Sequence, residues 1–265
     1  MKKIRLILSA VLMMTAFGFI ACSHSASGSN GSGNSSNTSS SGNYQVGDIV
    51  LNDGTYLRNV TSVSDADKAK AIAVIYKVTG SKAYDVGLVH NKSGLKWCLD
   101  TANGYNTNFT DLQCEESGSA GNLSFTGDTD GSDNFTKISQ TLEANDDTEI
   151  EGNYPAFEFA KNYKNQTNSH VNGTAYANGW YLPAFSELFD IWKVKDTVDA
   201  KSNLCGGSQF SDNFYWSSSQ NFDWGMPYIY SFIHMKWKNV EKDATLIRYK
   251  QTIKPICVCC IRAFN

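Results

Sequence analysis

A run of small polar residues divides this chain and limits where a hydrophobic core can form. Residues 23–43 are almost entirely Ser, Gly and Asn. A segment of this composition has no apolar surface to bury, so we expect a flexible tether over 22–43 rather than part of a domain. The remaining residues, 44–265, are long enough for one large domain or two small ones.

The N-terminus has the pattern of an export signal. Lys2, Lys3 and Arg5 precede an apolar stretch over 6–20, and Ala21 supplies a small side chain before a cleavage site. This stretch is shorter than the roughly 20 apolar residues that a membrane-spanning helix needs. We therefore interpret residues 1–21 as a signal peptide that is removed on export.

The last residues of the signal peptide indicate how the protein is attached to a membrane. The sequence Phe-Ile-Ala-Cys at 19–22 resembles a lipobox, which predicts lipidation of Cys22; an ordinary cleaved signal without lipid is the alternative. Each buried methylene contributes about 0.8 kcal/mol, so several acyl chains would hold the protein on a membrane. We expect a lipoprotein of the cell envelope, displayed at the outer-membrane surface and bound to the membrane through Cys22.

The net charge of the chain argues against two classes of binding partner. Loss of the three signal-peptide cations changes the formal net charge from −3 to about −6. An acidic chain of this kind is a poor match for nucleic acid or anionic lipid head groups. We expect a monomer with no nucleic-acid partner.

Six cysteines follow Cys22, and export permits them to form disulfides. Six cysteines allow 15 pairings, which the sequence alone does not resolve; a bridge between Cys98 and Cys114 is one plausible pair. On a strand, Cys257 and Cys259 share one face and Cys260 takes the other. Because no further C-x-x-C pair accompanies this cluster, buried thiols or one disulfide are favoured here over a metal site.

The first third of the domain has the signals of antiparallel sheet. Residues 49–57 read as a hairpin, because Asn52-Asp53-Gly54 supplies the positive φ that its turn needs. Ser64 is a candidate cap for a short helix that ends at Lys70. A second hairpin is expected over 71–90 with its turn at Gly80-Ser81, followed by a strand over 95–99.

Residues 100–152 are polar, Gly-rich and acidic, with weak periodicity. Within them, the sequence Asp-Thr-Asp-Gly-Ser-Asp at 128–133 has the spacing of a calcium loop. The glutamate and flanking helices of an EF-hand do not follow. An exposed acidic loop is therefore favoured, and we expect no metal and no cofactor.

The rest of the domain combines helices with strands. Helical spacing predicts one helix over 154–163 and a second over 184–198, which Gly206-Gly207 follows. Strand signals then return at 214–217, 228–237 and 256–264. The order predicts an α+β domain with mainly antiparallel sheets and two helices.

Three motifs in this order resemble those of a known family. They are Gly-Trp-Tyr-Leu-Pro at 179–183 leading into a helix with Glu187-Leu188, Tyr-Trp-Ser-Ser-Ser at 215–219, and Cys-Ile-Arg-Ala-Phe at 260–264. They resemble the C-type lectin fold in its formylglycine-generating-enzyme-like branch. With the opening of the domain, the chain looks most like the Treponema variable protein group, surface lipoproteins that retroelements diversify.

The residues of the same motifs also suit structural positions in a hydrophobic core. Trp180, Leu182 and Trp216 are large apolar residues beside turn formers, which suits core positions. Residues 217–219 are expected to pack tightly and bond neighbouring backbone rather than act as nucleophiles. Ile261 and Phe264 are expected to lock the last strand into the sheet.

A candidate ligand face lies between these motifs. A loop at 221–227 leads into a strand on which Tyr and His alternate with aliphatic residues, so one face suits a core and the other presents amphipathic rings. The alternative is that both faces are buried. The resemblance also implies a variable ligand site here. The candidate ligand-binding residues are Asn221, Phe222, Asp223, Trp224, Met226, Tyr228, Tyr230 and His234.

These features predict a displayed receptor or adhesin that binds a protein or glycan and is not an enzyme. The sequence contains none of the common hydrolase motifs, and few histidines are available as bases. A structural envelope lipoprotein is one alternative. A cysteine-dependent oxidase is another, because the family resemblance places Cys257 and Cys260 near the end where a relative carries a cysteine pair.

Overall fold

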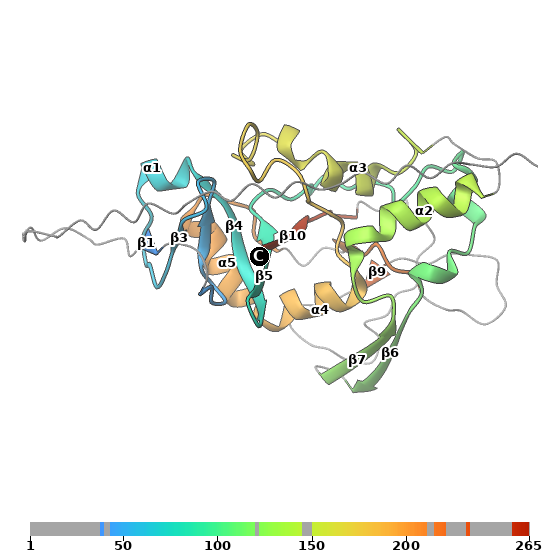
Figure 1. The fold of residues 1–265 in the computed structure, drawn as a ribbon, viewed down its shortest axis with the longest axis horizontal. Coiled ribbons are helices and arrows are strands. Elements are labelled where there is room, and N and C mark those ends of the chain that lie inside the picture. The colour runs from blue at the N-terminus through green and yellow to red at the C-terminus, as the bar shows by residue number, and fades with distance from the viewer. Residues whose placement is uncertain are drawn as a thin grey trace, which may run out of the picture. The chain divides into compact units, whose positions relative to one another are not determined.

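The fold of the domain is mixed α+β, with antiparallel pairing in every sheet (Figure 1). This confirms the predicted α+β class. All described residues lie within the unit Ser36–Asn265. The computed structural model describes residues 38–39, 43–119, 122–144, 150–210, 215–220, 232–233 and 256–264.

A six-stranded sheet forms the centre of the domain, in the order β1-β3-β2-β4-β5-β10. The last strand, β10, lies against β5 and pairs Ile261 with Val86. Two further sheets are antiparallel pairs of strands, β6 with β7 and β8 with β9. The strands are β1 Thr38–Ser39, β2 Ile49–Leu51, β3 Tyr56–Leu57, β4 Ala71–Thr79, β5 Lys82–Gly87, β6 Cys114–Ser119, β7 Asn122–Gly127, β8 Tyr215–Trp216, β9 Phe232–Ile233 and β10 Ile261–Phe264.

Both predicted hairpins are confirmed. Gly54 adopts a φ of +87° at the turn between β2 and β3, a conformation that costs glycine little because it has no Cβ. The backbone N–H of Thr55 donates to Asp53 Oδ1 at 3.0 Å, which closes the same turn. The turn between β4 and β5 places Gly80 at a φ of +60°.

The predicted strand over 95–99 is wrong. The N–H of Leu95 donates to the carbonyl of Ile256, while the N–H of Leu99 donates to that of Asn153. Because the two ends of this segment bond different parts of the chain, no continuous ladder forms. The apolar side chains of this segment still pack in the core, although its backbone is irregular.

Five α-helices occur in the described part of the chain, where two longer ones were predicted. Ser64 caps the first as expected, its side chain accepting the Asp67 N–H at 3.1 Å. The predicted helix over 184–198 is instead two helices that meet at Val194, whose backbone leaves the helical region. The helices are α1 Asp65–Lys68, α2 Asn134–Glu143, α3 Pro155–Lys161, α4 Phe185–Lys193 and α5 Lys195–Leu204, with 3₁₀ turns η1 Asn103–Asn106, η2 Thr110–Leu112, η3 Gly131–Asp133 and η4 Tyr163–Asn165.

The central sheet is buried on both faces. Val74 of β4 faces a cluster that includes Leu188 and Ile191 of α4. Ile72 and Ile75 face the opposite cluster, which contains Trp97, Phe157 and Trp180. A strand covered on both sides reads as a continuous apolar run, as β4 does. None of the helices in the described ranges has the length and apolar character that crossing a bilayer requires.

The six described cysteines are buried and are not joined in disulfides. The plausible bridge between Cys98 and Cys114 is therefore wrong, and the two side chains belong to different apolar clusters. The predicted division of the C-terminal cysteines is confirmed, because Cys257 and Cys259 face one cluster and Cys260 faces the other.

Candidate functional site

The predicted ligand face and the lipidation residue lie outside the described residues. This applies to Cys22 and to Asn221, Phe222, Asp223, Trp224, Met226, Tyr228, Tyr230 and His234. The structure does describe both flanks of this segment, residues 215–220 before it and 256–264 after it, together with the strand Phe232–Ile233 inside it.

The two flanks are held together by backbone hydrogen bonds. The N–H of Trp216 donates to the carbonyl of Cys257 at 3.0 Å, and Tyr215 forms a bridge with the same residue. Gln220 is fixed to another segment, because its N–H donates to the Leu112 carbonyl at 2.7 Å. Backbone hydrogen bonds therefore fix the described residues on both sides of this segment.

The residues at these anchors are fully buried, as their predicted role in the core requires. Trp216 has an exposed fraction of 0%, and its indole Nε1 donates to the Leu95 carbonyl at 2.6 Å. Trp97 lies nearby in the same cluster and donates from its own Nε1 to the Ser217 carbonyl at 3.0 Å. These two bonds satisfy both indole donors inside the core.

The serines at 217–219 are structural, as predicted. The N–H of Ser218 donates to the Pro183 carbonyl at 2.8 Å. Ser219 Oγ accepts the Phe185 N–H at 3.0 Å and donates to Asp128 Oδ2 at 2.8 Å. The serines thus connect β8 to the start of α4 and to the loop before α2.

The predicted exposed acidic loop is confirmed at Asp130 and Asp133 but is wrong at Asp128. The Asp128 side chain is buried and accepts hydrogen bonds from Asn134 Nδ2 at 2.7 Å and from Ser219 Oγ. Burial raises the pKa of this carboxyl, although these hydrogen bonds oppose the shift. Nowhere in the described ranges do three or more potential metal-ligating side chains converge.

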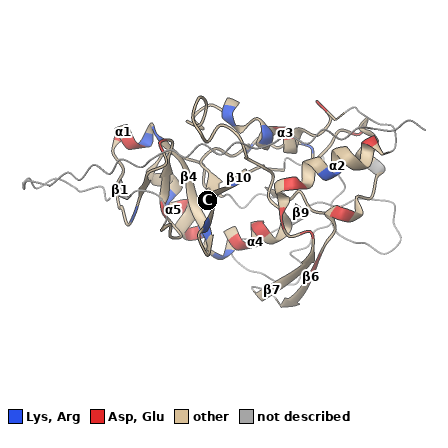
Figure 2. Ribbon diagram, in the orientation of Figure 1, with Lys and Arg blue, Asp and Glu red and all other residues tan. Residues whose placement is uncertain are grey.

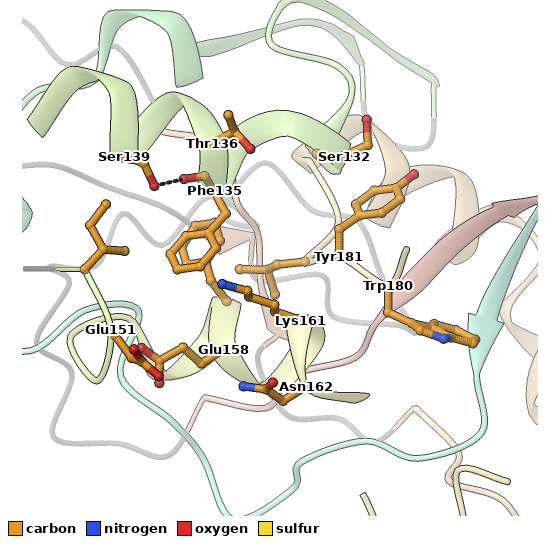
Figure 3. A pocket seen from close by; sticks show the side chains of 14 residues that line it. Ser132, Phe135, Thr136, Ser139, Glu151, Glu158, Lys161, Asn162, Trp180 and Tyr181 are labelled. Atoms are coloured by element: carbon orange, nitrogen blue, oxygen red, sulfur yellow. Dashed lines mark hydrogen bonds between the residues drawn. The ribbon is translucent and has the colours of Figure 1, made fainter. Parts of the chain in front are cut away.

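A cavity of about 650 Å³ opens between α2 and α3 (Figure 3). One wall comes from α2, another from α3, and the segment Trp180–Leu182 completes it. Such a volume lies in the range of small-molecule sites. The polar side chains that line it are Ser132, Thr136, Ser139, Glu151, Glu158, Lys161 and Asn162.

The charged groups of this cavity are not paired with one another. Glu158 Oε1 accepts the Gly152 N–H at 2.5 Å. The Lys161 ammonium lies 5.5 Å from the centre of the Phe135 ring. Among the described residues, neither Glu158 nor Lys161 has an ion-pair partner.

Glu187 lies behind one wall of the cavity and holds that wall in place. Its Oε2 accepts the N–H groups of Gly131 and Ala184 at 3.0 and 2.8 Å. Its Oε1 accepts the Tyr181 hydroxyl at 2.9 Å. Burial raises the pKa of Glu187 to about 7. One carboxyl therefore links η3, the cavity wall and the first turn of α4.

Comparison with known proteins gives no relative: no family model, curated protein or solved structure matches this chain. The assignment of function therefore depends on the residues and their geometry.

Sequence reasoning missed the cavity because it lies in a region that looked like polar loop. A signal was present, since Phe135, Ile138 and Leu142 recur at helical spacing along α2. The walls also come from segments far apart in sequence, so no local pattern joins them. Lys, Arg, Asp and Glu are interspersed over the described elements, including those around the cavity (Figure 2).

Proposed function

We propose that this chain is a lipid-anchored receptor or adhesin of the bacterial envelope. Its domain, 44–265, would adopt a C-type-lectin-like fold and bind a protein or glycan through residues 221–234. The signal and lipobox pattern supports the anchor, and the order of the three motifs supports the fold. The ligand face itself remains a prediction from the sequence.

The observation that carries the proposal is the anchoring of both flanks of residues 221–255. Trp216 and Cys257 are buried and joined by a backbone hydrogen bond. Binding residues are commonly carried by segments that a rigid scaffold positions. A segment that begins and ends at such an anchor can vary in side chains without changing where it is presented.

The state of the thiols supports a binder over a cysteine-dependent oxidase. Cys257 and Cys260, the pair that this alternative requires, are fully buried and face different apolar clusters, and burial raises the pKa of the Cys260 thiol. The thiolate is the reactive form of cysteine, so a raised pKa disfavours redox chemistry at this pair. Their positions in the two apolar clusters account for them as packing residues.

The test begins with the full-length protein in detergent, screened against arrays of glycans and of secreted proteins. For the ligand so found, Trp224→Ala and Tyr230→Ala should each weaken binding by about 1–3 kcal/mol while the protein stays folded. Val78→Ala, at an exposed site on β4, should bind like the wild type. Unfolding of both aromatic variants would show that these rings belong to the core and would contradict the proposal.

Diversification of the segment has its own test. The resemblance implies sister copies that differ mainly between residues 213 and 249, with a template and reverse transcriptase nearby. Adenine-directed rewriting of Asn codons can produce Phe222, Tyr228 or Tyr230, but not Trp224 or Met226. Sister copies that vary uniformly along the chain would contradict this part of the proposal.

A further inference from the structure

Two oppositely charged side chains of the short helix α3 line the cavity without forming an ion pair with each other. Glu158 and Lys161 lie three residues apart on α3, a spacing at which oppositely charged side chains usually meet. Elsewhere Lys193 pairs with Asp190 at the same spacing, at 2.5 Å, and Lys195 pairs with Asp199 at 2.6 Å. The separation on α3 therefore has a local cause.

That cause is visible on the acidic side. The Gly152 N–H holds Glu158 Oε1 at 2.5 Å, which turns the carboxylate away from Lys161 and toward Glu151 (Figure 3). In this view the side chains of Glu151 and Glu158 lie at the same end of the cavity. Oε2 of Glu158 has no hydrogen-bond partner among the described residues. This end suits an ammonium group.

The basic side lies at the ring of Phe135. The Lys161 ammonium is 5.5 Å from the centre of that ring, and it has no ion-pair partner among the described residues. This end suits a carboxylate.

The apolar part of the lining limits the kind of ligand. Phe135 stacks on Phe157 with ring centres 5.3 Å apart and an interplanar angle of 18°, and Lys161 approaches the Phe135 ring as well. A sugar needs an open ring face to stack on, and these contacts occupy the faces of Phe135. Ile150 and Leu182 add aliphatic surface, which suits an apolar side chain.

We propose that this cavity binds a small zwitterion, a free α-amino acid or dipeptide with an apolar side chain. Its ammonium group lies between Glu151 and Glu158, its carboxylate meets Lys161, and its side chain packs on Ile150 and Leu182. The cavity volume of about 650 Å³ accommodates either ligand. The proposal is argued from described residues alone and does not depend on the proposed receptor function.

The first experiment measures binding to the full-length protein in detergent by titration calorimetry. The probes are L-phenylalanine, L-leucine and the dipeptide leucyl-leucine, so that the two sources of the zwitterion are distinguished. N-acetyl-phenylalanine lacks the ammonium and phenylalaninamide lacks the carboxylate. Each blocked compound should bind at least about tenfold more weakly than phenylalanine, the loss of one charged contact.

Variants then assign each charge to its residue. Lys161→Gln should weaken phenylalanine about tenfold and leave phenylalaninamide unchanged, and Glu158→Gln should weaken phenylalanine and leave N-acetyl-phenylalanine unchanged. Glutamine at 158 can still accept the Gly152 N–H. Lys164→Gln, on the neighbouring turn η4, is the matched control and should bind like the wild type.

Three results would overturn the proposal. The first is the absence of saturable binding by any of the zwitterions. The second is equal binding of phenylalanine and its two blocked forms, and the third is an effect of Lys164→Gln as large as that of Lys161→Gln. The compound series does not depend on any variant, so it decides the matter even where a substitution prevents folding.

Discussion

Two regions of the domain use their polar groups in opposite ways. Around Ser217–Gln220, hydrogen bonds join buried side chains to groups that are distant in sequence, as Ser219 does with the Phe185 N–H and the Asp128 carboxylate. In the cavity between α2 and α3, Lys161 and one oxygen of Glu158 have no hydrogen-bond or ion-pair partner among the described residues. The first arrangement fixes a geometry, and the second leaves interactions for another molecule.

The largest expected loss of stability is at Trp216, one of the buried residues that flank residues 221–255. Trp216→Ala removes a fully buried ring and the bond to the Leu95 carbonyl, so the free energy of unfolding should fall by about 3–5 kcal/mol. Urea unfolding measures it. Trp192→Ala, a partly buried ring on α4, should cost clearly less. Equal losses would contradict a special role for the anchor.

The second expected effect is a dependence of stability on pH. It comes from Glu187, the buried carboxyl behind the cavity wall. The pKa of Glu187 rises from 4.5 to about 7 on folding because the carboxyl is buried. Between those values the folded state keeps a proton that the unfolded state releases, so stability falls as pH rises through this window. The fall attributable to this group is about 3 kcal/mol.

Glu187→Gln should remove this dependence, because the amide does not titrate while its oxygen still accepts the Gly131 and Ala184 N–H groups. Urea unfolding at pH 5 and pH 8 compares the two proteins. The variant should lose about 3 kcal/mol less than the wild type between these pH values. Glu115→Gln, at an exposed position on β6, is the control. Identical pH profiles for wild type and Glu187→Gln would contradict the prediction.

A smaller loss is expected from one serine of the anchor. Ser219→Ala removes the acceptor of the Phe185 N–H and one donor to Asp128, which should lower the free energy of unfolding by about 2 kcal/mol. Ser186→Ala removes a bond to the Thr129 carbonyl at an exposed site. It should cost less than about 0.5 kcal/mol, and a reversed order would contradict the contrast drawn above.

The smallest effects on stability belong to the cavity. Lys161→Gln and Glu158→Gln break no ion pair among the described residues, so each should change the free energy of unfolding by less than about 0.5 kcal/mol. Thermal and urea unfolding measure this. Losses above about 1.5 kcal/mol would show that these charges support the fold.

Local signals predicted the local features of the fold. Gly54 marked the first hairpin, Ser64 marked the start of α1, and the period of a strand divided Cys257 and Cys259 from Cys260. In each case the physical cause lies within a few residues of the chain.

Features that depend on distant partners were not predictable in this way. Asp128 looked like part of an exposed acidic loop, yet it bonds to Ser219, 91 residues away. The lack of a strand over 95–99 likewise follows from hydrogen bonds to distant backbone, from Leu95 to Ile256 and from Leu99 to Asn153. The cavity combines α2, α3 and residues 180–182, so no single stretch of sequence announces it.

The central proposal is that the buried flanking residues, Trp216 and Cys257, maintain the fold while residues 221–234 are available for a ligand. The most direct test replaces Phe222, Trp224, Tyr228 and Tyr230 together by serine and measures the free energy of unfolding in urea. The account predicts a change below about 1 kcal/mol. A loss as large as the 3–5 kcal/mol or so expected for Trp216→Ala would place these rings in the core and contradict it.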